Sequence, residues 1–375
     1  SIVPCSGIYL FARHDPFTIL DNHSNSDVKL DPNKRPCLTS TRSASLLRVS
    51  TTVRHMTLEA APLIDLAAFE QGDTQTQQRI AQLVDEACQH TGFLAITNHG
   101  ISHDITHNMW QAVQQFFDCS LDQKQQSKVP HPGYPYGYMS NEAETLSASL
   151  GNATPPDLKE TFNGGPPLIP THITDPDALD FCYAPTPWPT QPPAFTESWN
   201  NYYNAMQDLA ARVMRLFATA LQLEPNFFDE YITSPISALR ALNYPPQDHA
   251  PQPNQLRAGA HSDYGTLTIL WPQDNSRGLQ IQRPDNTWQE VAPIPGAFII
   301  NIGDLMARWT NNRWRSTLHR VANPAQHDPT SRRQSIAYFH QPNWDAVIAC
   351  LTDTQPLYAP VASGPYLMSK FQATV

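Results

Sequence analysis

The sequence has few positive charges and no long apolar run. It carries 24 Lys and Arg against 34 Asp and Glu, which gives a formal net charge of −10 at pH 7. Proteins hold nucleic acids and anionic membranes through clustered Lys and Arg, so this balance argues against both as partners. No stretch of about 18 consecutive apolar residues is present, so no membrane span is expected.

The sequence also lacks paired cysteines. No CxxC motif occurs, which argues against a disulfide framework and favours free thiols in a reducing compartment. We therefore expect a cytoplasmic protein, and we also expect it to be a monomer. The six cysteines are Cys5, Cys37, Cys88, Cys119, Cys182 and Cys350.

Apolar residues and proline, by contrast, are plentiful. The 375 residues, 40% of them hydrophobic, are enough for one large domain or two with a substantial core. The 35 prolines gather in connecting segments, a distribution typical of long ordered loops around a β core. No internal repeat occurs.

Residues 1–55 show no sustained hydrophobic periodicity. Within them, residues 38–55 contain Ser, Thr and Arg but no acid, a composition typical of transit peptides. This stretch lies inside a longer leader and lacks a secretory apolar segment. We expect a leader that is either disordered or a non-native extension; organelle targeting and a functional arm are the alternatives.

Periodicity divides the rest of the chain into helices followed by strands. Apolar residues at helical spacing predict helices over residues 79–90, 105–117 and 195–221. From about residue 237 the period changes to two. About seven or eight short antiparallel strands predict a mainly β fold with flanking helices, built on a jelly-roll, or double-stranded β-helix, core. The expected strands cover residues 61–66, 239–244, 266–271, 279–283, 288–291, 298–302, 319–322 and 335–339.

The stretch RAGAHSDYGTLTILW, residues 257–271, carries His261 and Asp263 two positions apart. On a strand this spacing puts both side chains on one face, so an imidazole and a carboxylate converge. His319, in a later predicted strand, is a candidate third ligand. Two His and one carboxylate on one face of a metal are typical of non-haem Fe(II) oxygenases, although the same donors also suit Zn and other metals.

Arg333 and Ser335 lie two positions apart at the start of the last predicted strand. Strand alternation points both side chains the same way. A guanidinium beside a hydroxyl is suited to binding a carboxylate. Such a pair has no purpose beside a purely structural metal, so it favours a metal site that also binds a carboxylate ligand.

These motifs, in this order, resemble those of a known family. HxD at 261–263, STLHRV at 316–321 and RQSIAYF at 333–339, with NIGD at 301–304 and WTN at 309–311 between them, are similar to those of the iron- and 2-oxoglutarate-dependent dioxygenases of the isopenicillin N synthase-like family. The string GFLAITNHG at 92–100 also resembles that family. The resemblance covers roughly residues 61–374, and it implies a C-terminal capping helix over residues 364–371.

The resemblance implies an enzyme that binds Fe(II) and 2-oxoglutarate and uses O2 to oxidise a small-molecule metabolite, releasing succinate and CO2. The implied Fe(II) ligands are His261, Asp263 and His319. The residues implied to hold the far carboxylate of 2-oxoglutarate are Arg333, Ser335 and Tyr244. The candidates for lining the substrate pocket are Tyr264, Phe339 and His340.

One departure from the family pattern lies next to Tyr244. Relatives often carry Asn two positions before this Tyr, whereas this chain has Leu242 there and Asn243 one position later. The resemblance therefore implies the Tyr244 contact but not a second one. We expect His99 to organise a turn rather than to bind metal, because the triad is complete without it.

Hydroxylation, desaturation and cyclisation share this kind of site, and the sequence does not choose among them. Two other functions stay open at this point: a same-fold Fe(II) oxidase that does not use 2-oxoglutarate, and a non-enzymatic, metal-dependent module that binds a small molecule. The expected division is a leader (1–55), an N-terminal helical and loop region (56–180), a long buttressing helix (181–234), the jelly-roll catalytic core (235–345) and a C-terminal capping segment (346–375).

Overall fold

The computed structural model describes residues 60–375 except 152–153, 248–249, 325–329, 353–354 and 373–375. The predicted leader, residues 1–55, lies outside the described residues. The strands are β1 Leu63–Asp65, β2 Phe93–Thr97, β3 Gly137–Met139, β4 Glu160–Gly164, β5 Ala238–Tyr244, β6 Ala258–His261, β7 Leu267–Pro272, β8 Leu279–Gln282, β9 Trp288–Glu290, β10 Phe298–Ile302, β11 His319–Val321, β12 Arg333–His340, β13 Val347–Ile348 and β14 Val361–Ala362. The helices are α1 Leu66–Gln71, α2 Thr74–His90, α3 His103–Asp118, α4 Leu121–Gln125, α5 Pro176–Phe181, α6 Phe195–Ala220, α7 Asp304–Trp309 and α8 Ser363–Gln372, with 3-10 turns at Leu146–Leu150 and Asp229–Ile232.

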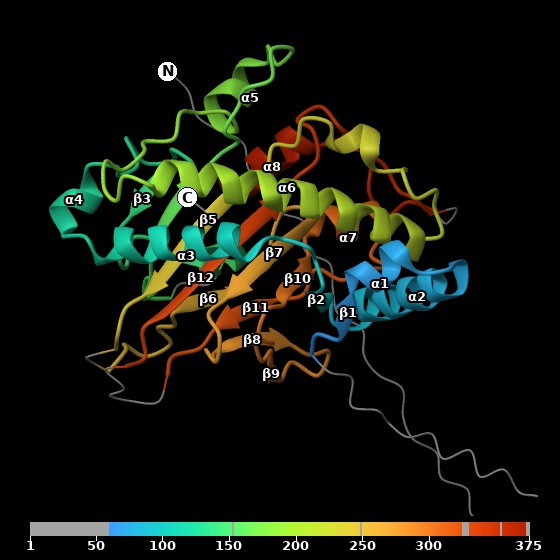
Figure 1. The fold of residues 1–375 in the computed structure, drawn as a ribbon, viewed down its shortest axis with the longest axis horizontal. Coiled ribbons are helices and arrows are strands. Elements are labelled where there is room, and N and C mark those ends of the chain that lie inside the picture. The colour runs from blue at the N-terminus through green and yellow to red at the C-terminus, as the bar shows by residue number, and fades with distance from the viewer. Residues whose placement is uncertain (1–59, 152–153, 248–249, 325–329, 353–354, 373–375) are drawn as a thin grey trace, which may run out of the picture. The chain divides into compact units, whose positions relative to one another are not determined.

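Two main sheets carry the fold (Figure 1). The larger has eight strands in the order β1-β2-β10-β7-β12-β5-β4-β3, and the smaller has four in the order β6-β11-β8-β9. The strands from β5 to β12 pair antiparallel, as predicted, whereas β1 pairs with β2 in parallel. The expected double-stranded β-helix with flanking helices is confirmed.

The larger sheet crosses the predicted boundaries of the chain. It contains the four strands β1, β2, β3 and β4 of the expected N-terminal region together with strands of the expected catalytic core. Neighbours in one sheet exchange backbone hydrogen bonds, so the two regions share a single hydrogen-bonded framework. The division at residues 180, 234 and 345 stays a prediction.

β12 lies in the larger sheet between β5 and β7 and separates two environments. Successive strand side chains point to opposite faces. Ile336 and Tyr338 belong to the main apolar core, where the Tyr338 ring packs against Tyr203 of α6 at a centroid distance of 5.2 Å. The residues of the other face, which line a cavity between the sheets, are Arg333, Ser335, Ala337 and Phe339.

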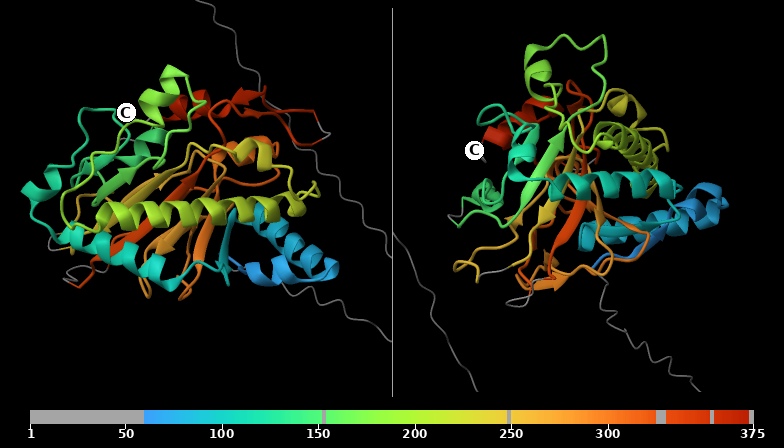
Figure 2. Two further views of the ribbon diagram at one scale, coloured as in Figure 1. Left: turned by 45° about the horizontal axis from the view of Figure 1, so that its top comes forward. Right: turned by 60° about the vertical axis from the view of Figure 1, so that its left-hand side comes forward.

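α6 covers the outer face of the larger sheet, and α2 and α3 pack against it (Figures 1 and 2). Its apolar side chains recur at helical spacing and are fully buried, as Trp199, Met206 and Val213 illustrate. This confirms the helix predicted over residues 195–221. The sheet behind the cavity is therefore supported by a continuous apolar layer.

The flanking helices begin where polar side chains cap them. Ser102 precedes α3, and its hydroxyl accepts a hydrogen bond from the Asp104 amide at 3.1 Å. α2 begins earlier than its apolar pattern indicated, because Asp73 accepts from the Thr76 amide and caps it. The predicted C-terminal helix is α8.

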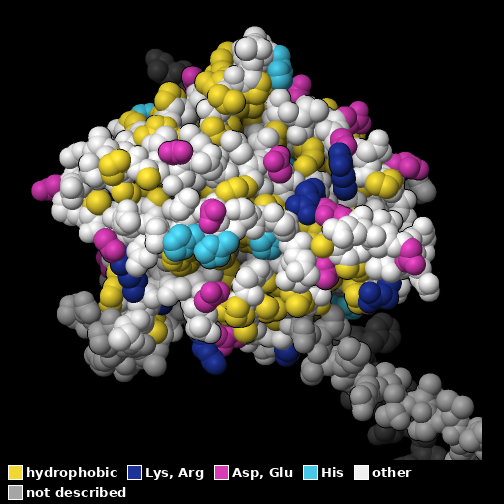
Figure 3. Space-filling model, viewed as in Figure 1, with side chains coloured by type: hydrophobic (Ala, Val, Ile, Leu, Met, Phe, Trp, Pro, Cys, Tyr) yellow, Lys and Arg dark blue, Asp and Glu magenta, His cyan; other side chains and the backbone are white. Residues whose placement is uncertain are grey.

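Within the described residues, no helix combines the length and the apolarity that crossing a membrane requires. On the face shown in Figure 3, Lys and Arg side chains are scattered among acidic and neutral ones. That face therefore shows no continuous basic band.

Candidate active site

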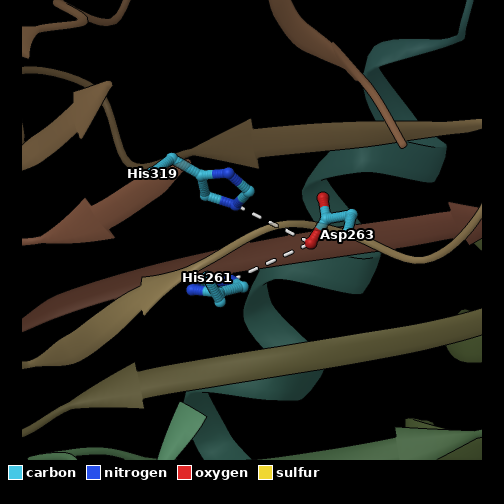
Figure 4. A group of neighbouring side chains, drawn as sticks. All are labelled: His261, Asp263 and His319. Atoms are coloured by element: carbon cyan, nitrogen blue, oxygen red, sulfur yellow. Dashed lines mark ion pairs between the residues drawn. The ribbon is translucent and has the colours of Figure 1, made fainter. Parts of the chain in front are cut away.

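Three side chains from β6, the turn after it and β11 converge on one point (Figure 4). Nε2 of His261 lies 3.8 Å from Oδ1 of Asp263, and Nε2 of His319 lies 3.7 Å from the same oxygen. His319 and His261 are also register partners across β11 and β6. Among the described residues, no other group of three or more His, Cys, Asp or Glu side chains has a metal-binding arrangement. The structure thus brings the predicted triad together.

The backbone orients both imidazole rings. Nδ1 of His261 lies 2.8 Å from the carbonyl oxygen of Gly259, and Nδ1 of His319 lies 3.1 Å from that of Thr317. A carbonyl oxygen only accepts, so each Nδ1 carries the hydrogen and donates it. In the neutral imidazole, Nε2 is then left with a lone pair directed toward Asp263, which is the form that binds a metal.

Asp263 is held by two hydrogen bonds to one of its oxygens. Oδ2 accepts from the Thr268 hydroxyl at 2.6 Å and from the Asn301 amide at 2.7 Å, which leaves Oδ1 for a metal. Burial raises the pKa of Asp263, but the neighbouring histidines and these two donors outweigh it, so the pKa lies below its usual value. The carboxylate is ionised at neutral pH.

His261 is neutral at the same pH. Burial, reinforced by the nearby His319, lowers its pKa to about 3. A neutral imidazole needs no deprotonation before it binds a metal. Two imidazole nitrogens and one carboxylate oxygen are the donor set typical of non-haem Fe(II), so the residues present fit that ion.

The sequence suggested that strand alternation brings His261 and Asp263 together. The structure shows a different arrangement. β6 ends at His261, and Asp263 lies in the turn that follows. The Asp304 amide donates to the carbonyl of Asp263 at 2.7 Å and fixes this turn. Gly265 lets the chain pass close to β12, because a Cβ there would lie 2.4 Å from the carbonyl oxygen of His340.

A buried cation lies in the same cavity. Arg333 is 3% exposed, its Nε has no hydrogen-bond partner, and no carboxylate among the described residues lies within ion-pair distance of it. Its Nη1 donates to the Ser335 hydroxyl at 3.3 Å, and its guanidinium carbon lies 4.9 Å from the centre of the Tyr244 ring. A buried charge without a counter-charge is costly, so this group is suited to an anionic ligand.

Asn243 points away from that group. Its amide donates to Oε1 of Glu160 at 2.8 Å, and its carbonyl oxygen accepts from Nε of Arg332 at 2.8 Å. These contacts lie on the opposite face of β5 from Tyr244 because strand side chains alternate. The shifted Asn therefore does not replace the family's second contact.

The triad and Arg333 open into one cavity of about 930 Å³. Tyr264 and Phe339 line it. His340 does not, because it belongs to the opposite face of β12: it is 1% exposed, and its Nδ1 lies 2.7 Å from the hydroxyl of Thr266. The expected substrate contact at His340 does not fit this geometry.

A buried ionic network, which sequence reasoning missed, supports β6. Nζ of Lys159 lies 2.6 Å from Asp157 and 3.0 Å from Glu144, which in turn pairs with Arg240 at 3.2 Å. Oδ1 of Asp157 accepts the amide of Gly259 at 2.9 Å. The same Gly259 carries the carbonyl that orients the first imidazole ring, so the network is linked to the triad. Lys159 and Asp157 are two positions apart, but Arg240 and Gly259 come from later segments, and no spacing signal connects them to this pair.

His99 stabilises a turn, as predicted. Its Nδ1 accepts the Ile101 amide at 3.1 Å, and its Nε2 lies 3.2 Å from the carbonyl oxygen of Gly296. Both ring nitrogens are thus engaged away from the triad.

The comparisons with known proteins agree with this site. Residues 235–342 match the 2OG-Fe(II) oxygenase superfamily, and residues 61–191 match the non-haem dioxygenase in morphine synthesis N-terminal region. Validamycin A dioxygenase of Streptomyces hygroscopicus subsp. limoneus is 32% identical, over 81% of this chain and 81% of its own. This chain belongs to the 2OG-Fe(II) oxygenase superfamily.

Two further relatives extend the match. The 2-oxoglutarate-Fe(II) type oxidoreductase hxnY of Emericella nidulans is 32% identical over 80% of this chain and 86% of its own. A full-length Neurospora crassa protein, crystallised in complex with alpha-KG and thymine, has a TM-score of 0.73 at 29% identity, covering 84% of this chain and 97% of that one. As a 2OG-Fe(II) oxygenase, the protein is an oxidoreductase that uses Fe(II), 2-oxoglutarate and O2 to oxidise a small molecule.

Proposed function

We propose that His261, Asp263 and His319 hold the Fe(II) of this oxygenase, and that Arg333 binds the far carboxylate of 2-oxoglutarate. One observation carries this proposal: a buried guanidinium without a counter-charge faces the same cavity as the His-Asp-His triad. Ser335 and Tyr244 complete the carboxylate site.

When bound, Fe(II) together with 2-oxoglutarate supplies the oxidising chemistry, in which 2-oxoglutarate is converted with O2 to succinate and CO2 and the substrate is oxidised. The residues of the chain provide position and shielding. Asn301 and Thr268 keep Oδ2 of Asp263 occupied, so that Oδ1 alone faces the metal position. The apolar walls exclude water from the reacting groups.

The substrate is a small metabolite that enters the cavity beside the triad, where Tyr264 and Phe339 lie. Hydroxylation, desaturation and cyclisation are all compatible with this cavity. The thymine bound to the Neurospora crassa protein and the validamycin in the name of the Streptomyces relative support a polar small molecule. Succinate release across a panel of candidate metabolites identifies the substrate.

The proposal includes a monomeric cytoplasmic enzyme without a nucleic-acid partner. The net charge of −10 supports it, and so do the free thiols of the described cysteines Cys88, Cys119, Cys182 and Cys350. Sedimentation as a single species of 42.0 kDa is expected, and a stable dimer would contradict this part.

The test of the metal and 2-oxoglutarate sites is spectroscopic. Under anaerobic conditions, Fe(II) and 2-oxoglutarate should give the wild-type protein the weak visible absorption of a keto-acid chelate. Asp263→Ala and His319→Ala should abolish this band. Asp285→Ala, in an exposed turn, is the control and should retain it. Tight Fe(II) binding without the band in the wild type would contradict the proposal and favour a same-fold oxidase that does not use 2-oxoglutarate.

A further inference from the structure

The end of the cavity opposite Arg333 contains an amide that the proposed chemistry does not use. The cavity-facing side chains of β12 begin with Arg333 and end with Phe339, and Gln341 follows directly after the strand. Phe339 is the register partner of Thr268, whose hydroxyl donates to Asp263. Gln341 therefore lies on the other side of the triad from the proposed carboxylate site.

The side-chain amide of Gln341 is buried and unsatisfied. The residue is 4% exposed, its Oε1 has no hydrogen-bond partner, and no bond to its Nε2 exists among the described residues. Its backbone amide donates to Oγ of Ser237 at 3.1 Å, so the backbone N–H has a partner, unlike the side-chain oxygen. Buried polar groups without partners are rare and, where they persist, often mark functional positions.

The amide is also held close to the triad. It packs on Gly265, where a Cβ would lie 2.9 Å from Nε2 of Gln341, and Gly265 is in the same turn as Asp263. The side chain therefore lines the cavity where a substrate must approach the metal position. A partner for the amide can come from a molecule in that cavity.

The surroundings of Gln341 select an uncharged partner. Ile236, Tyr264 and Leu367 belong to one apolar cluster that faces the cavity, and the Ile236 amide bonds the carbonyl of Pro342, directly after Gln341. Burying an unpaired charge against such a wall is costly. A neutral hydrogen-bonding group fits this corner without that cost.

We propose that Gln341 recognises the substrate of this oxygenase, and that the group it binds is a neutral cyclic amide, such as a lactam or an imide. A primary amide presents a donor and an acceptor side by side, which complements the N–H and C=O of a cis amide. The aromatic side chains of Phe339 and Tyr264 suit a flat ring. This inference rests on the proposed function, because it places the substrate opposite 2-oxoglutarate across the triad.

The test uses thymine, uracil, 2-piperidone and succinimide, each compared with its fully N-methylated form. Each compound is titrated into protein loaded anaerobically with Fe(II) and 2-oxoglutarate, and the shift of the visible band reports binding. The wild type should bind at least one parent compound about tenfold more tightly than its methylated form, because methylation removes the N–H. Gln341→Met keeps the length of the side chain without its hydrogen bonds, and should bring this ratio to about one.

Gln114→Met is the control, because Gln114 is exposed on α3; it should keep the wild-type ratio. Thermal unfolding separates recognition from a structural role. An amide that only supports the fold would lower Tm when it is replaced, whereas loss of an unsatisfied amide should leave Tm unchanged or raise it. If Gln341→Met does not fold, Gln341→Asn, which withdraws the amide from the cavity, is expected to remove the preference instead.

A preference that survives in the Gln341 variants overturns the inference, and so does a wild type that forms the visible band but shows no preference for any parent compound. Both results leave the proposed function intact. A wild type without the band overturns the proposed function, and the inference with it.

Discussion

Single residues set the charge of the cavity, and Arg333 is a buried cation there that no described carboxylate pairs with. A carboxylate of 2-oxoglutarate matches its guanidinium in a bidentate manner. Arg333→Leu is therefore expected to weaken 2-oxoglutarate binding by about 2–5 kcal/mol, the magnitude seen when one partner of a buried charge pair is removed. Anaerobic calorimetry on the Fe(II)-loaded protein measures this loss.

Arg332 provides the matched control for that change. It is the preceding residue and points to the other face of the sheet, where it bonds Asn243 and pairs with Asp118. Arg332→Leu should leave 2-oxoglutarate affinity unchanged while it reduces stability. Equal losses of affinity in both variants would mean that the sheet, and not the guanidinium, is responsible.

Asn301 acts on the metal through Asp263. Its amide donates to Oδ2 at 2.7 Å, and such outer hydrogen bonds orient a ligand and raise its affinity for metal. Asn301→Ala should lower Fe(II) affinity by about 10- to 100-fold. Anaerobic Fe(II) titration measures the change, with Thr287→Ala, in an exposed turn, as the control. An unchanged Fe(II) affinity in Asn301→Ala would show that the Thr268 bond is sufficient.

The strand β6 depends on the ionic network beside it, and this dependence has a pH signature. Burial raises the pKa of Glu144, but Arg240 and Lys159 outweigh it and lower the pKa from its ordinary 4.5 to about 2. As the pH falls, the Glu144 carboxylate is therefore protonated in the unfolded chain before it is protonated in the folded protein. The contribution of Glu144 to stability is complete above pH 4.5 and is lost as the pH falls toward 2.

Denaturant unfolding across this pH range isolates the effect. Glu144→Gln should be less stable than the wild type at neutral pH, and the difference should shrink as the pH falls from 4.5 toward 2. The buried His261 and His340, each with a pKa lowered to about 3, reduce stability in acid in both proteins, so they cancel in the comparison. A difference that does not change with pH would exclude an ionised Glu144.

The helices and strands could be predicted from the sequence because each buries one face, which leaves a periodic pattern of apolar residues. Helical spacing located α6, and alternation located β12 with Arg333 and Ser335 on one side. The same alternation, followed from Arg333 to the end of the strand, would have excluded His340. His340 is next to Phe339 in the sequence, but its side chain lies on the opposite face of the strand.

Other parts of the site depend on tertiary contacts that no local pattern encodes. Asp263 reaches the triad through a turn fixed by the backbone of α7, and β1 joins the sheet in parallel. The amide of Gln341 became notable only because the folded chain buries it without a partner. Sequence spacing therefore predicted which residues come together. The hydrogen bonds and packing that hold them in place could be identified only in the structure.

The molecule as a whole divides the proposed ligands between its two sheets. His261 and His319 come from the smaller sheet, whereas Arg333 and Tyr244 belong to the larger one. 2-Oxoglutarate that reaches from the metal position to Arg333 is in contact with both. Ligand binding should then stabilise the packing of the two sheets against each other, and not only the loops around the site.

Thermal unfolding tests this coupling. A ligand that binds only the folded protein stabilises it by about 2.7 kcal/mol at a concentration one hundred times its Kd. Fe(II) and 2-oxoglutarate together should therefore raise Tm by several degrees under anaerobic conditions. Asp263→Ala should lose the whole increase, whereas Arg333→Leu should keep the part due to Fe(II) alone, because its change affects only the larger sheet's contact. If 2-oxoglutarate added to Fe(II) raises Tm equally in Arg333→Leu and in the wild type, the cosubstrate does not bridge the sheets through this residue.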